Sequence, residues 1–161
     1  MYKLVLIVAM MIVWLSVHLL QVEEEMAMKT LFQGKRAVNR AAHAAAQQFD
    51  KTALSEGVLK IDSSSAKGAA LLYLQANLLL DASLMPLHNS FLKDQVEVVV
   101  FDIINSDKSF PFYYRNDTYD FEVTLQRPGV IIIAKMEYPR RFSVMGPIEW
   151  NIKGAAELVM G

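Results

Sequence analysis

The chain has 161 residues, a formal net charge of −1 and no cysteine. A near-neutral charge gives no electrostatic basis for binding nucleic acid, and the lack of cysteine excludes disulfides and thiolate metal sites. The length leaves room for one domain of ordinary size with its own core.

The N-terminal segment is an almost unbroken apolar run. Residues 1–22 contain one charged side chain, Lys3, and the run from Leu4 to Leu20 is at the short end of what spans a bilayer as a helix, about 20 residues. The small-residue cleavage pattern of a signal peptide does not follow, so the sequence predicts a retained hydrophobic anchor. Lys3 and the amino terminus carry positive charge, which predicts a single-pass protein with a cytoplasmic N-terminus. The expected packing face of the anchor consists of Leu4, Ile7, Met11, Trp14 and Leu15.

The anchor helix is predicted to continue into an alanine-rich helical stalk over residues 23–57, which Gly57 ends. If Gly34 does not interrupt it, one rod runs from about Lys3 to Phe49, roughly 70 Å long. The spacing of Ala37, Ala41 and Ala45 places a small apolar surface on one side of this helix. Two uses of this alanine face stay open: packing between subunits, or packing on the second helix and sheet of the same chain. An uncovered face favours assembly, and a covered one favours a monomer.

Three consecutive glutamates, Glu23, Glu24 and Glu25, follow the anchor. They are interpreted as a solvated end to the anchor. The alternative is an assembly role, in which they pair with cations of a neighbouring subunit, and the candidate cations are Lys35, Arg36 and Arg40.

Residues 58–161 are predicted to form a small α+β extracytoplasmic head. Asp62-Ser63-Ser64-Ser65 is an N-cap signal for a second, shorter helix over about Ala66 to Leu80. The second half changes to the alternating pattern of strands, with short connections that favour an antiparallel, four- to five-stranded meander. The expected strands are Gln95–Ile104, Tyr119–Gln126, the very apolar Val130–Met136, and Ile148–Lys153, with Phe112–Tyr114 before a turn at Arg115–Asp117.

Catalysis has no positive signal, since nucleophile-elbow, zincin, P-loop and dinucleotide motifs are all missing from the sequence. We therefore predict a protein that is not an enzyme and that uses no cofactor and no metal. Aspartates near the sheet's turns offer one alternative, a cation site, although turn aspartates are common for backbone reasons alone. These are Asp102, Asp107, Asp117 and Asp120.

The order of these features resembles type IV pilin-like proteins, and more closely the TadE/TadG-like pseudopilins of tight-adherence (Tad) pili. The resemblance rests on the alanine run 37–46 after the anchor, on the second helix at 71–77, and on Phe142-Ser143-Val144-Met145-Gly146 with Gly154-Ala155-Ala156 near the end. Pilins normally carry a glutamate at the fifth mature position, where this chain has Val5 if Met1 is the mature start.

The resemblance implies a structural subunit, major or minor, of a bacterial surface filament. Its partners would be copies of itself and other pilus-assembly proteins, with the anchor helices packed in the filament core. It would reside in the cell membrane and then, once assembled, at the cell surface. The alternative is a membrane-anchored accessory or binding domain that stays in the membrane. A membrane-attached enzyme is the third and weakest hypothesis.

Overall fold

The structure, a computed structural model, describes residues 2–140 and 146–159. It confirms the predicted α+β fold, in which a long N-terminal helix precedes shorter helices and antiparallel strands. Its elements are α1 (Tyr2–Ala46), α2 (Lys51–Ser55), α3 (Ser63–Leu78), β1 (Glu97–Ile104), β2 (Phe112–Asn116), the 3-10 turn η1 (Asp117–Tyr119), β3 (Phe121–Leu125), β4 (Gly129–Tyr138) and β5 (Ile148–Glu157).

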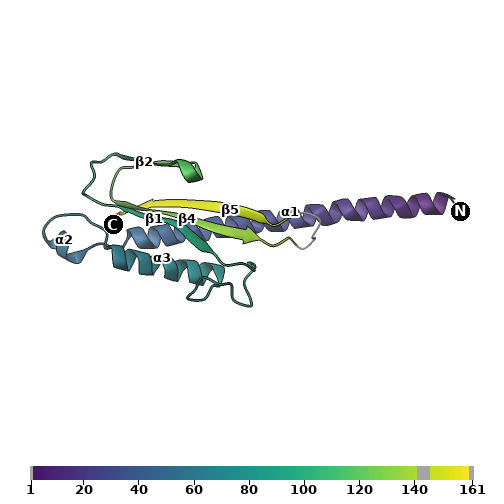
Figure 1. The fold of residues 1–161 in the computed structure, drawn as a ribbon, viewed down its shortest axis with the longest axis horizontal. Helices are drawn as coiled ribbons and strands as arrows, with labels where there is room; N and C mark the ends of the chain where they lie inside the picture. Colours follow the sequence, from purple (N-terminus) through teal and green to yellow (C-terminus); the bar gives the residue numbers. More distant parts are fainter. Residues whose placement is uncertain (1, 141–145, 160–161) are drawn as a thin grey trace.

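Helix α1 is one uninterrupted helix of 45 residues, about 68 Å long at 1.5 Å per residue. The predicted rod is confirmed, although it ends at Ala46 and not at Phe49. Gly34 does not break it, and its lack of a side chain leaves room for side chains of the sheet. A Cβ atom there would lie 2.6 Å from Ile152 Cδ1 and 3.0 Å from Met136 Sδ. Figure 1 shows the N-terminal part of α1 projecting alone from the rest of the molecule.

The chain then turns back along α1. Gly57 ends the helical stretch as predicted, with a φ of +77° that suits glycine, but the stretch consists of two helices, α1 and α2. Asp62 caps α3, because its Oδ2 accepts a hydrogen bond from the Ser65 backbone N–H at 2.8 Å. Hydrogen bonds from Ser65 also lower the pKa of Asp62. The predicted second helix is therefore confirmed, three residues earlier at its start than expected.

Helix α1 packs against both α3 and a three-stranded antiparallel sheet with the order β1-β4-β5. Strand β4 is central, as its apolar sequence predicts, and it is buried over most of its length. Ile132 pairs with Phe101 of β1 on one side and with Gly154 of β5 on the other. Alternate β4 residues, among them Val130, Ile132 and Ala134, share one core cluster with the alanines of α1 and with Leu74 and Leu78 of α3.

The strands do not form the single meander that the sequence predicts. Strands β2 and β3 pair only with each other, and this hairpin lies apart from the three-stranded sheet in Figure 1. Its apolar side chains pack on the sheet instead of extending it, in a second core cluster around Ile104, Leu125 and Ile131. The physical reason is that β4 is apolar on both faces, so the face turned away from α1 also needs a cover.

Polar contacts also tie the hairpin to the sheet: Lys153 Nζ of β5 donates to the Asp120 carbonyl at 2.8 Å, and the Gln126 backbone N–H donates to Glu157 Oε1 at 2.6 Å. The Tyr114 hydroxyl donates a hydrogen bond to Asp102 Oδ2 at 2.6 Å. Burial, and then this hydrogen bond, raise the pKa of Tyr114 above its ordinary value. A tyrosine whose pKa is raised by folding stabilises the fold fully below its unfolded pKa, about 10, and this stabilisation is lost as the pH rises through the folded pKa.

We expect Tyr114→Phe to destabilise the protein at pH 7 by about 1.5–3 kcal/mol, the usual net contribution of a hydrogen bond to a carboxylate. Above pH ~10 the difference from the wild type should shrink, because the wild type loses the same contribution there. Denaturant unfolding at several pH values measures both effects. Tyr73→Phe, at an exposed position of α3, is the control and should change neither. A difference that stays constant across this pH range would contradict the assignment.

Candidate membrane anchor and assembly surface

The N-terminal part of α1 is apolar and uncovered. Among the described residues, α1 is the one helix long and apolar enough to cross a membrane, and its most apolar window has a mean hydropathy of 2.4 and no buried residue. The polar side chains in this segment have local contacts: the Ser16 hydroxyl donates to the Ile12 carbonyl at 2.8 Å, and the His18 ring stacks on Trp14 with 5.5 Å between ring centroids. The predicted packing residues are exposed by 51–69%; they are Leu4, Ile7, Met11, Trp14 and Leu15.

The environment of α1 changes at Glu23, which is the first buried residue of the helix. From Ala27 onward, one side of α1 is buried at Ala27, Thr30, Gly34, Ala37, Val38 and Ala41, a spacing of three and four residues that keeps to one side of a helix. The same helix is therefore a bare apolar rod at one end and part of a protein core at the other.

The predicted alanine face lies in that core. Ala37, Ala41 and Ala45 are exposed by no more than 1%, and they contact the sheet and α3 of their own chain. Of the two uses expected for this face, the structure provides packing within the chain. The face is not accessible to another subunit in the folded head. A covered face is the arrangement that favours the anchored domain over the assembled subunit.

The acidic residues after the anchor differ in their surroundings. The expected solvated end to the anchor is wrong for Glu23, which is buried, whereas Glu24 is exposed. Glu25 pairs within the helix with Lys29, at 2.7 Å between the carboxylate and Nζ. This hydrogen bond and the charge of Lys29 lower the pKa of Glu25.

The three candidate cations are also placed differently. Lys35 Nζ donates to the backbone carbonyl of Lys153 on β5. Arg40 Nη1 donates to Asn77 Oδ1 of α3 at 2.7 Å. Within the described ranges 2–140 and 146–159, the Arg36 side chain has no hydrogen-bond or ion-pair partner.

Sequence reasoning missed a surface beside these cations. Met28 and Phe32, four residues apart on α1, are 49% and 56% exposed, although they lie beyond the predicted anchor. An open groove of about 480 Å³ adjoins Phe32, lined by Lys29, Phe32, Gln33, Arg36, Ala37, Arg40 and Asn77. The signal that could have found it is the four-residue spacing of Met28, Phe32, Arg36 and Arg40, which places all four on adjacent positions of one helix side.

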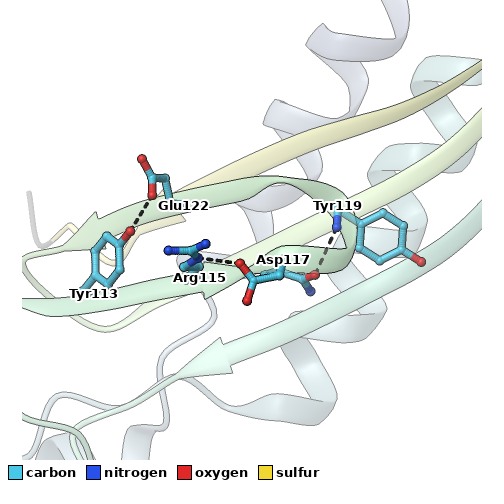
Figure 2. Close-up of polar contacts among 6 residues, drawn as sticks. Tyr113, Arg115, Asp117, Tyr119 and Glu122 are labelled. Carbon is cyan, nitrogen blue, oxygen red and sulfur yellow. Dashed lines mark hydrogen bonds and ion pairs between the residues drawn. The ribbon is translucent and has the colours of Figure 1, made fainter.

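In the part of the chain that the structure describes, the turn aspartates do not form a cluster that could bind a cation. Asp102 accepts a hydrogen bond from Tyr114, and Asp117 accepts one from Arg115 Nε at 2.5 Å. Figure 2 shows the Arg115–Asp117 pair at the hairpin, beside the hydrogen bond from Tyr113 to Glu122 on the neighbouring strand. Among the described residues, no group of three or more potential metal ligands is present. Residues 141–145, which include most of the Phe142–Gly146 motif, lie outside the described part.

We expect Ala41→Glu to destabilise the head, because it would place an unpaired charge in the core at a cost of about 3–5 kcal/mol. Thermal unfolding of the full chain in detergent, followed by circular dichroism, measures this loss. Ala76→Glu makes the same change at an exposed position of α3 and should leave the melting temperature almost unchanged. A normally folded Ala41→Glu protein would contradict the core position of this face and return it to the candidates for packing between subunits.

Comparison with known proteins gives no match: no protein-family model, no curated protein and no solved structure is similar to this chain.

Proposed function

We propose that this protein is a pilin-like structural subunit of a surface filament, held by α1 in the membrane before assembly and by α1 in the filament core afterwards. One observation carries the proposal. A single rigid helix has an apolar, uncovered N-terminal part and a C-terminal part whose buried side belongs to the core of a folded head. The helix thereby joins a part that needs an apolar environment to a head that folds around it.

The uncovered part of α1 exposes apolar side chains that are unfavourable in water. Burying one large apolar side chain stabilises by about 1.5–3 kcal/mol, and this segment exposes many of them, including Leu6, Ile7, Met11 and Trp14. Such a rod does not remain in water. Lipid covers it in a membrane, and the same rods of neighbouring copies cover it in a filament. Repeated head-to-tail contacts that do not close into a ring give a filament.

The proposed orientation places the N-terminus in the cytoplasm and the head outside. Lys3 supports it from the N-terminal flank. The cations Lys29, Lys35 and Arg36 lie on the other flank, but they belong to a folded domain, and domains are translocated largely regardless of their charge.

A second candidate is a membrane-anchored accessory or binding domain that never leaves the lipid. The covered alanine face favours it, because the head satisfies its own small apolar surface. Under this function the uncovered side chains of α1 contact lipid alone.

The test is made on cells that express the chain. Material sheared from their surface is imaged by electron microscopy, and the intact mass of the chain is measured in the sheared and the membrane fractions. We expect filaments that contain this chain, and the mass identifies its first residue. A chain that is found only in the membrane fraction, as a monomer, would reject the filament function in favour of the anchored domain.

A substitution separates lipid contact from helix contact. Trp14→Ala keeps the anchor apolar, so we expect an unchanged amount in the membrane, but it removes the largest side chain available for contact between helices. The yield of sheared filaments should fall several-fold. Val58→Ala, which shortens an exposed apolar side chain outside α1, is the matched control and should not change the yield. Equal yields from both variants would argue against packing through this part of the anchor.

A further inference from the structure

Helix α1 presents a second uncovered surface, above the anchor and turned away from the core. It consists of Met28, Phe32 and Arg36, spaced by four residues, with Lys29 and Arg40 beside them. We call it the upper face. Within the described part of the chain nothing covers Met28 and Phe32, each of which is about half exposed. Apolar side chains flanked by cations are suited to a partner that is itself apolar with acidic residues next to it.

The chain carries such a partner surface in its own anchor. The apolar rod ends at Leu20 and Val22, and the acidic residues follow at once. Of these, Glu25 is already paired with Lys29, and Glu23 is buried. Glu24 is exposed, and its side chain has no hydrogen-bond or ion-pair partner among residues 2–140 and 146–159. Glu24 and Arg36 are thus an acid and a base on one helix, both without a partner in the described structure.

These two residues cannot meet within one chain. They lie on the same straight helix, about 18 Å apart along its axis at 1.5 Å per residue. An ion pair needs its charged atoms within about 4 Å. Only a second copy, displaced along the helix axis, brings Glu24 to Arg36.

We propose that the upper face binds the α1 helix of a second copy displaced by about 18 Å along the axis, so that Glu24 of the partner subunit pairs with Arg36. This inference rests on the proposed filament function and specifies its helix-to-helix register. The pairing of Glu24 with Arg36 sets the displacement between the two helices. The apolar side chains Met28 and Phe32 supply most of the buried contact area. The same displacement brings the last turn of the partner's anchor, with its Leu20, to the level of Phe32.

Two copies that rest in the same bilayer cannot make this displaced contact. Two copies anchored in one bilayer hold their apolar rods at the same depth, because each rod is barely long enough to span the hydrocarbon. A displacement of about 18 Å would move more than half of one rod out of the hydrocarbon. The contact is therefore made when one copy rises against its neighbour during assembly, and not between two copies that rest in the membrane.

Cysteine cross-linking tests the register directly, because the chain has no cysteine of its own. Chains carrying both Glu24→Cys and Arg36→Cys are co-assembled with wild-type chains and treated with a short bis-maleimide. We expect cross-linked dimers and higher multimers in the sheared filaments and monomers in the membrane fraction. A short linker cannot join the two positions within one chain, so each multimer reports contact between copies. Chains with Glu24→Cys and Lys60→Cys, an exposed position outside α1, are the control and should stay monomeric.

Filaments that form but give no multimers beyond the control would overturn this register and leave the filament function intact. A wild-type chain that forms no filaments would overturn both. Multimers that appear equally in the membrane fraction would overturn the claim that the displaced contact belongs to assembly.

Charge reversal tests the ion pair independently of the cross-linker. Arg36→Glu and Glu24→Arg each place like charges together, and we expect each to lower the filament yield about ten-fold or more. The double variant restores opposite charges between copies and should recover most of the yield. Lys51→Glu, an exposed lysine in α2, is the matched control and should not change it. A double variant as poor as the single variants would reject the pairing of Glu24 with Arg36.

Discussion

The close packing of α1 on the sheet is the constraint on which the rest of the structure depends. Ala41 and Ala45 are fully buried, and a Cβ atom on Gly154 of β5 would lie 2.9 Å from Val38 Cγ1 and 3.3 Å from the Val38 carbonyl of α1. Small residues allow this approach, so one side of α1 belongs to the core of the head.

Local signals in the sequence were sufficient to predict most helices and strands, but not to predict which elements pack against one another. The capping residue Asp62, the apolar strand around Ile132 and the continuous helix could all be predicted, because each depends on nearby residues. The separation of the β2–β3 hairpin could not, since the alternation of Phe121, Val123 and Leu125 shows that one side is buried without showing which surface buries it. The alanine face had the same ambiguity, and only the fold resolved it.

In the candidate site, too, one part could be predicted from the sequence and another could not. The candidate anchor can be predicted from the length of its apolar run, because a bilayer imposes a minimum length on any helix that spans it. The charges beyond it are not predictable in this way, since the partners of Lys35 and Arg40 lie far away in sequence, at Lys153 and Asn77. Two of the three predicted cations, Lys35 and Arg40, therefore have partners within the chain. Arg36 remains, beside the exposed Met28 and Phe32, which the sequence placed neither in the anchor nor in the core.

The uninterrupted passage of α1 through Gly34 also fixes how the head is aimed. A flexible linker would let the head turn freely relative to the apolar segment, but here that segment and the part of α1 that packs in the head's core are one continuous helix. Any tilt of the anchor is inherited in full by the head. A tilt of about 20°, common for membrane helices, would swing the Ala46 end of the helix sideways by about 12 Å relative to Val22. If this helix spans a bilayer, its tilt therefore sets the direction in which the head points.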